Sequence, residues 1–213
     1  MATTRRKPLS RERILETAVA LADEQGIEAL SMRKLGQSLG YEAMSLYNHV
    51  ANKDDLLDGM LDIVLAEMEP PEPEEGLAGI RRAAISAHEA LQRHPWAAAM
   101  LMAPNRVRPA RLQYMDALLA SLRLAGFSPE TTYHAYHVLD AHVIGFSLWQ
   151  TTHGSLPPDV GDLRAFLDRM LPVDSYPDLN AHGRQHLDEG PHREVSAFEF
   201  ALDLILESLE RLR

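Results

Sequence analysis

The side chains best suited to catalysis do not occur at the spacings that catalysis requires. His88-Glu-Ala-Leu-Gln92 begins like the zinc-protease pattern HExxH, but glutamine stands where the second imidazole ligand is needed. Ser147 follows Gly145 by two residues, as in a nucleophile elbow, yet it lies within a predicted helix and Trp149 replaces the closing glycine. The sequence has no P-loop, no GxGxxG and no cysteine. We therefore expect no enzyme, no catalytic residues and no cofactor.

Histidines are the remaining candidates for metal binding. His134, His137 and Asp140 recur every three residues, so they lie along one helix face and could hold a metal or a polar ligand. His182 and His186 are spaced i, i+4, with His192 nearby. Ordinary polar helix and loop positions explain both sets more simply, and the sequence predicts no metal site.

A further set of side chains is suited to DNA. Two short predicted helices, from Met32 to Leu39 and from about Ala43 to His49, are joined by three residues and flanked by longer helices, which are helix-turn-helix proportions. In the second helix Leu46 and Val50 can pack inward. The residues that then face outward, toward base edges, are Ala43, Met44, Ser45, Asn48 and His49. Tyr47 and Lys53 suit phosphate contacts, and Arg33 can reach a phosphate or a guanine edge.

The charge distribution agrees with a DNA-binding N-terminal region. The whole chain carries a net charge of −10, but residues 1–53 hold eight Lys or Arg and six Asp or Glu. The excess of acid therefore lies entirely in the rest of the chain, and a mildly basic head on an acidic body can approach DNA in one orientation. The Arg5-Arg6-Lys7 run within residues 1–10 is either a flexible basic arm that reaches the duplex or a solubilising tail.

In every segment that could position these side chains, the apolar residues recur at helical spacing, so the fold is predicted to be all-α. Ser10, Ser31 and Asn52 are the expected N-caps of the first, second and fourth helices. The helix-turn-helix takes up about residues 31–50 of an N-terminal domain at 11–68, which ends in a linking helix at 53–68. After the proline-rich boundary at 70–75, a C-terminal domain at 77–213 has helices near 77–93, 95–103, 108–125, 129–153, 162–171 and 195–212, with a loop from 171 to about 193.

The predicted helices at 129–153 and 195–212 have apolar stripes that are broader than packing against one neighbour requires. We therefore expect a homodimer whose interface includes Val143, Phe198, Leu202, Ile205, Leu206 and Leu209. No apolar run approaches the roughly 18 residues of a membrane helix, and the absence of cysteine suits a reducing compartment, so the sequence predicts an intracellular protein without a membrane partner.

The segment Leu30 to Leu57 resembles the helix-turn-helix of the TetR family, most specifically in Leu46-Tyr47-x-His49-Val50-x-Asn52-Lys53-x-x-Leu56-Leu57. More weakly, His94-Pro-Trp96, Ala125-Gly-Phe-Ser-Pro129 and Leu139-Asp-x-His-Val-Ile-Gly-Phe146 resemble the C-terminal domain of the tetracycline-repressor branch. The resemblance implies phosphate contacts by Tyr47 and Lys53 and base contacts by the reading helix. Ala43 and Met44 differ from the tetracycline repressor, so the operator sequence should differ too.

The same resemblance implies a dimer formed by four helices, and an effector pocket within residues 60–150. We expect Trp96, Met100, Met102, Asn105, Tyr114, His137 and Phe146 to contribute to that pocket. The predicted function is a repressor bound to a pseudo-palindromic double-stranded DNA operator and released by a small, hydrophobic effector through a shift of the linking helix. The alternative is a DNA-binding dimer whose C-terminal body is only a scaffold and binds no effector.

Overall fold

The computed structural model describes residues 8–103, 108–153, 163–189 and 196–213. Every regular element in these ranges is helical, and none of their residues forms a strand, as predicted. The N-terminal helices are α1 (Arg11–Gln25), α2 (Met32–Leu39), α3 (Ala43–Leu46) and α4 (Lys53–Ala66). The body contains α5 (Gly76–Arg93), α6 (Pro95–Leu101), α7 (Pro109–Leu124), α8 (Pro129–His153), α9 (Leu163–Met170), α10 (Pro177–Glu189) and α11 (Ala197–Glu210), with 3-10 turns at Ile27–Ala29 and Pro73–Glu75.

The three predicted N-caps are confirmed. The side chains of Ser10, Ser31 and Asn52 accept hydrogen bonds from the backbone N–H groups of Arg13, Lys34 and Asp55. Each bond satisfies an amide in a first helical turn that has no partner within the helix. Short-range sequence signals therefore set where α1, α2 and α4 begin.

Helix α3 is shorter than predicted. Its α-helical part ends at Leu46, and residues 47–49 continue as tighter turns in which His49 N–H donates to Leu46 O at 2.9 Å. Val50 N–H also donates to Leu46 O, at 3.0 Å, which draws the chain back toward the core before α4 begins. The element has the predicted place but a different geometry over its last turn.

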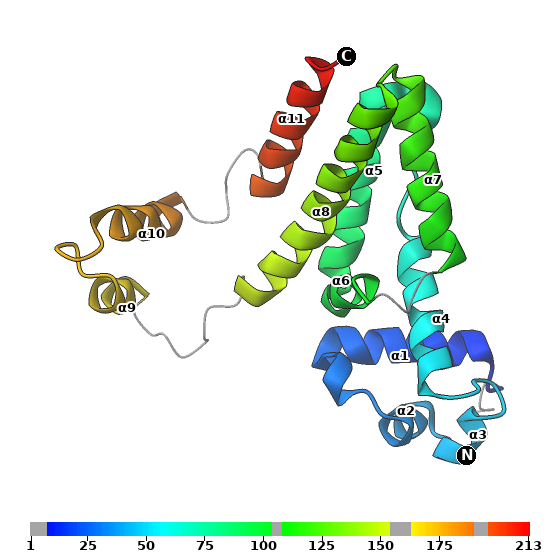
Figure 1. The fold of residues 1–213 in the computed structure, drawn as a ribbon. Coiled ribbons are helices and arrows are strands. Elements are labelled where there is room, and N and C mark those ends of the chain that lie inside the picture. Colours follow the sequence, from blue (N-terminus) through cyan, green and yellow to red (C-terminus); the bar gives the residue numbers. More distant parts are fainter. Residues whose placement is uncertain (1–7, 104–107, 154–162, 190–195) are drawn as a thin grey trace.

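Helices α1 to α4 form the N-terminal head, and the helices from α5 onward form the body, which is a helical bundle. The body packs against the head, and α4 runs from the head into the body (Figure 1). Helices α5, α7 and α8 form the centre of the body, α6 lies at its lower end beside α1, and α11 lies against α8 and α5. The core is continuous from head to body and includes Leu35, Leu46, Met60, Leu91 and Leu202, all buried.

Helix α11 is anchored to its neighbours by stacked rings and charges. The Phe198 ring stacks between His88 of α5, at 3.8 Å between centroids, and His142 of α8, at 4.6 Å. Arg81 of α5 pairs with Glu199 and Asp203 of α11. Because one side of α11 meets these two helices, that side is not available to another chain.

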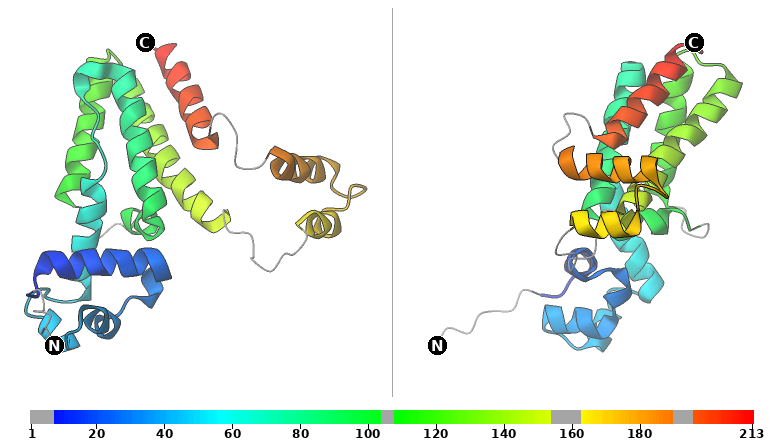
Figure 2. Two further views of the ribbon diagram at one scale, coloured as in Figure 1. Left: turned by 180° about the vertical axis from the view of Figure 1, so that it is seen from behind. Right: turned by 90° about the vertical axis from the view of Figure 1, so that its left-hand side faces the viewer.

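The loop predicted from 171 to about 193 is wrong over Pro177–Glu189, which forms α10. Pro177 begins that helix, where its fixed φ suits the first turn and its missing N–H costs nothing, and Asp178 lies in the electropositive first turn. The Asn180 side chain donates to Leu171 O at 2.7 Å, and Arg184 pairs with Asp168 of α9. Helices α9 and α10 pack on each other and stand away from the rest of the body (Figures 1 and 2).

No helix among the described residues combines the length and apolar character needed to span a bilayer.

Candidate DNA-binding surface and effector cavity

The predicted DNA contacts lie together on the lower surface of the head. Met44, Tyr47, Asn48, Lys53 and Arg33 are exposed. The remaining three, Ala43, Ser45 and His49, are half-buried, whereas Leu46 and Val50 are buried in the core as predicted. The surface thus offers an exposed thioether, a phenol, an amide and two cations from α2, α3 and the start of α4, a set that matches base edges and phosphates in chemistry.

Close contact between α2 and the turn after it fixes the angle of α3. A Cβ added to Gly36 would lie 2.7 Å from Tyr41 O and 3.1 Å from Ala43 N, both backbone atoms. Tyr41 N–H also donates to Gly36 O at 2.9 Å, so the two segments are locked face to face. Gly40, with a φ of 75°, ends α2 in the left-handed conformation that this turn requires. No sequence pattern pointed to Gly36, because its role depends on the approach of the turn that follows α2.

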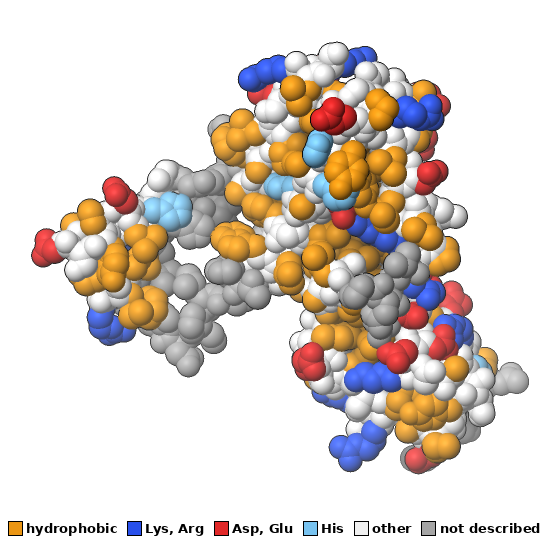
Figure 3. Space-filling view, in the orientation of Figure 1, with side chains coloured by type: hydrophobic (Ala, Val, Ile, Leu, Met, Phe, Trp, Pro, Cys, Tyr) orange, Lys and Arg blue, Asp and Glu red, His pale blue; other side chains and the backbone are white. Residues whose placement is uncertain are grey.

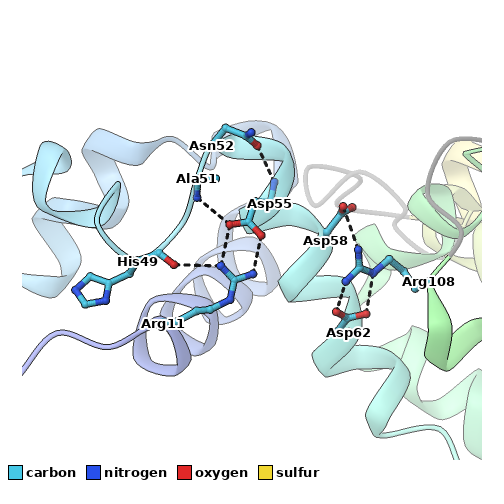
Figure 4. A network of polar contacts seen from close by, with 8 residues as sticks. All are labelled: Arg11, His49, Ala51, Asn52, Asp55, Asp58, Asp62 and Arg108. Carbon is cyan, nitrogen blue, oxygen red and sulfur yellow. Dashed lines mark hydrogen bonds and ion pairs between the residues drawn. The ribbon is translucent and has the colours of Figure 1, made fainter.

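A charge network ties the end of the reading segment to α1 and α4 (Figure 4). Arg11 donates to both carboxylate oxygens of Asp55, at 2.8 and 2.7 Å, and to the backbone oxygen of His49 at 3.1 Å. Hydrogen bonds from Arg11 and from Ala51 N–H lower the pKa of Asp55 to about 2, so this carboxylate stays ionised. The network holds His49 and α4 in one rigid unit.

A second charge cluster joins α4 to the body (Figure 4). Arg108, which precedes α7, donates from Nε to Asp62 Oδ1 at 2.9 Å and from Nη1 to Asp58 Oδ2 at 3.2 Å. Asp58 and Asp62 are one helical turn apart on α4, so a single guanidinium spans both. The cluster therefore couples the start of α7 to the helix that begins at the DNA-binding surface.

The body contains a narrow apolar cavity between α5, α7 and α8. Its walls include Met68, Leu91, Leu118 and Leu139, and its free volume of about 10 Å³ is no more than one water requires. Two charged residues interrupt these apolar walls. They are Arg111 of α7 and Asp140 of α8, which form an ion pair with each other. Burial raises the pKa of the neighbouring Tyr114 phenol to about 12, which keeps it neutral and able to donate a hydrogen bond.

Of the six predicted effector-pocket residues that lie within the described ranges, Tyr114 alone lines this cavity. His137 is exposed and donates from Nδ1 to Tyr133 O of its own helix at 2.7 Å, and Met102 is also exposed. Trp96 is buried at the junction with the head, where its Nε1 donates to Asp23 at 2.7 Å. Met100 and Phe146 are half-buried elsewhere, and Asn105 lies outside the described residues. Since residues on one helix face different sides, a stretch of α8 or α6 does not enter the cavity as a whole.

The predicted dimer residues differ in their burial within the protomer. Val143, Phe198, Leu202 and Leu206 are buried inside the protomer, where α11 packs on α5 and α8 and Val143 borders the cavity. Leu209 is also buried, but it and the half-buried Ile205 line an open groove of about 500 Å³ between α8 and α11, together with Val138, Leu204 and Leu212. The wide stripe of α11 thus has an inner and an outer side, and the predicted dimer residues come from both.

The outer side of α11 exposes Phe200 and Leu204, Leu212 is exposed just beyond the end of that helix, and α8 exposes Tyr133 and Val138. Figure 3 shows hydrophobic side chains gathered over this face of the body, interleaved with histidines. Apolar side chains so exposed on adjacent helices mark an interaction surface.

Among the described residues, no group of three or more His, Asp or Glu side chains is arranged to hold a metal ion. Asp140 is engaged by Arg111, and His137 by its own helix. His192 lies outside the described residues.

Comparisons with known proteins agree with this arrangement along the whole chain. Residues 14–60 match the family model described as bacterial regulatory proteins, tetR family, and residues 70–213 match the tetracyclin repressor-like C-terminal domain. The HTH-type transcriptional repressor DrrR1 of Streptomyces coeruleorubidus is 31% identical over 216 residues, which cover 96% of this chain and 78% of that protein. The class D tetracycline repressor protein of Escherichia coli is 30% identical over 210 residues, which cover 95% of this chain and 89% of that protein.

Solved structures give the same result. The crystal structure of the TetR family protein ActR from Streptomyces coelicolor in complex with actinorhodin superposes with a TM-score of 0.69 at 31% identity, and the alignment covers 96% of this chain and 98% of that one. The similarity includes the head, the body and the order of the helices.

Proposed function

Because the chain belongs to the tetR family of bacterial regulatory proteins, we propose that it is a homodimeric transcriptional repressor that a small, largely apolar effector releases from its operator. Operator DNA lies in the cytoplasm of bacteria, so this function also assigns the chain to that compartment.

The observation that carries the proposal is the continuity of α4 between the two sites. Lys53, at its first position, belongs to the DNA-binding surface, and Met68, just beyond its end, belongs to the wall of the cavity. A helix of this length spans about 21 Å, and the Arg108 cluster couples α4 to α7. A ligand that separates α7 from α8 must therefore also displace the head.

Release follows from the geometry of two half-sites. A dimer reads its operator with two heads separated by one helical turn of DNA, about 34–36 Å. The exposed apolar face of α8 and α11 suits the contact between two copies, because it lies on the body and leaves both heads free. A displacement of each α4 changes the separation of the heads, and operator affinity falls. The effector then lowers the affinity for the operator, and the operator lowers the affinity for the effector by the same factor.

The cavity indicates the character of the effector. Most of its lining is aliphatic, so the ligand should be largely apolar, while the Arg111–Asp140 pair and the Tyr114 phenol can meet one or two polar groups at a single point. Ligand entry must widen a space that now holds no more than one water, and this widening provides the force on α7.

That same narrow space favours a second candidate, in which the body is a dimerising scaffold without an effector. The two candidates share the DNA-binding function and differ only in regulation.

The test combines DNA selection with a ligand screen. A duplex selected from a random library with the purified protein should contain two inverted half-sites, and its binding should be measured by fluorescence anisotropy. Thermal unfolding should then be recorded against a set of polycyclic aromatic and fatty-acid compounds. A compound that raises the melting temperature should also release the selected duplex. Failure to enrich any duplex would refute the repressor function, whereas enrichment without any stabilising compound supports the scaffold.

A further inference from the structure

His94 joins the body to the head at the point where α5 ends and α6 begins. Its backbone N–H donates to Ala90 O and closes α5, while its own carbonyl accepts from Ala97 N and opens α6. Pro95 follows and cannot continue α5. Only 9% of the His94 side chain is exposed, so nearly all of its polar contacts are with protein.

Both ring nitrogens of His94 face carboxylates from the other part of the molecule. Nδ1 lies 2.9 and 3.0 Å from the two oxygens of Asp23 on α1, and Nε2 lies 3.1 Å from Glu67 Oε1 at the end of α4. An ionised carboxylate accepts hydrogen bonds and cannot donate them. Both contacts are therefore hydrogen bonds at the same time only when the imidazole carries a proton on each nitrogen.

Both carboxylates accept further hydrogen bonds from their surroundings. Trp96 Nε1 donates to Asp23 at 2.7 Å, and Arg93 donates to Glu67 from Nε at 3.0 Å and from Nη2 at 2.7 Å. Burial raises the pKa of Glu67, but the hydrogen bonds from Arg93 and His94 outweigh it and leave that pKa below its ordinary value.

The charged side chains in this cluster are Asp23 from α1, Glu67 from α4 and Arg93 from α5. A neutral ring leaves them with a net charge of −1, and a protonated ring makes the cluster neutral.

From this geometry we propose that the doubly protonated ring of His94 is the positioning residue that holds the DNA-binding head in its operator-binding orientation. The contact is separate from the Arg108 cluster, because it reaches α1 as well as α4 and starts from the α5–α6 junction. Loss of one proton turns a nitrogen lone pair toward a carboxylate, which opens one of the two contacts. Helices α1 and α4 then separate from the junction, and the two heads of a dimer lose their spacing. Operator affinity should therefore fall as the ring is deprotonated. The inference rests on the proposed operator-binding function.

The experiment compares wild type with His94→Gln on the selected duplex from pH 5.5 to 8.5, the range in which imidazoles gain or lose a proton. Glutamine can donate to one carboxylate and carries no charge. We expect the dissociation constant of the wild type to rise about tenfold more across this range than that of His94→Gln, the equivalent of one charge-assisted hydrogen bond. Every other ionisable group, including those at the DNA-binding surface, is present in both proteins, so its contribution cancels in the ratio.

A second readout needs no DNA. In a Trp149→Phe background Trp96 is the single tryptophan, and its indole N–H is bonded to Asp23 within the cluster. Its emission should change with pH in this background and stay constant when His94→Gln is added. Asp23→Asn keeps the shape of the cluster while removing one charge, so it should reduce the pH dependence of operator binding even if the glutamine variant folds poorly.

The outcomes separate the two proposals. Equal pH profiles of operator binding for wild type and His94→Gln, or an equal response of Trp96 emission to pH with and without His94, would overturn the role of His94 and leave the repressor function standing. A wild type that binds no selected duplex at any pH overturns the repressor function, and the role of His94 with it.

Discussion

Arg111 and Asp140 form an ion pair within otherwise apolar walls, with 12% and 25% of their side chains exposed. Removing one partner leaves a charge in a poorly solvated site, which costs more than the pair itself contributes.

We expect Arg111→Met and Asp140→Leu each to lower the free energy of unfolding by about 2 kcal/mol, less than for a fully buried pair because Asp140 keeps some solvent. The double variant should recover most of that loss, since apolar side chains suit the walls. Urea unfolding at one protein concentration measures all four proteins. Strictly additive losses would mean that the two charges do not interact. In the effector assay, the double variant should bind operator normally and respond more weakly to polar ligands.

The DNA-binding surface predicts two classes of variant. Lys53→Ala removes a phosphate contact and should weaken operator and random DNA alike, lowering the slope of log affinity against log salt by about two, one for each subunit. Tyr47→Phe should also act on both DNAs. Ser45→Ala and Asn48→Ala should instead change base preference in a repeated selection. A Lys53→Ala protein with unchanged affinity and salt slope would contradict the proposed docking.

A leucine-to-glutamate substitution should have different effects on the two sides of α11, loss of the dimer on the outer side and unfolding on the inner side. Leu204 is 51% exposed and Leu206 is 7% exposed. Leu204→Glu should therefore leave the helical circular dichroism intact, yield monomers in light scattering and abolish operator binding. Leu206→Glu places a charge in the protomer core and should unfold the chain. Glu207→Gln, exposed on the same helix, is the control and should change neither property. A dimer that persists in Leu204→Glu would exclude this face as the interface.

His88 predicts a loss of stability in acid. Its Nδ1–H donates to Ser147 Oγ at 2.8 Å, because the Ser147 hydroxyl proton is already given to Val143 O. Burial, with a smaller contribution from His142, lowers the pKa of His88 to about 4. The unfolded chain, with a histidine pKa near 6.5, then binds more protons than the folded one between pH 6.5 and 4. Stability is therefore full above pH 6.5 and falls as pH is lowered toward 4.

Because the ring keeps partial contact with solvent, we expect His88 to contribute about 1–2 kcal/mol to this loss. His88→Phe preserves the stack on Phe198 and should flatten that part of the profile in urea unfolding at pH 4.5 and 7. An unchanged difference between the two pH values would show that other groups cause it.

Substitution of Gly36 should impair DNA binding without unfolding the body. Gly36→Ala forces its Cβ against two backbone atoms that cannot move without changing the angle of α3, so operator affinity should fall by at least tenfold while the body stays folded. In the matched control, Gly183→Ala on α10, the nearest atom is the tip of Leu167 at 3.4 Å, and operator affinity should stay unchanged. Equal effects of the two substitutions would mean that the α2–α3 contact does not set the reading angle.

Much of this protein could be predicted from local sequence. Ser10, Ser31 and Asn52 are confirmed as caps because a cap bonds a backbone amide three residues away, so all of the necessary information is local. The inward positions of Leu46 and Val50 followed from helical periodicity for the same reason. Helix α10 was missed although Pro177 and Asp178 are proper start signals, because the glycine and histidine after them suggested a loop and the packing of α9 could not be foreseen.

Tertiary structure alone decided which side of each apolar stripe faces inward and which distant charges meet. Leu204 and Leu206 lie two positions apart on α11 and therefore on opposite sides of it, but only the position of α5 and α8 decides which of those sides faces inward. His94 meets Asp23 across 71 positions, and Arg108 meets Asp62 across 46. Neither contact has a sequence signature, because a hydrogen bond needs two groups within about 3 Å and periodicity gives only the direction of each side chain from its own helix. The residues that connect the body to the head were therefore visible only after folding had brought them together.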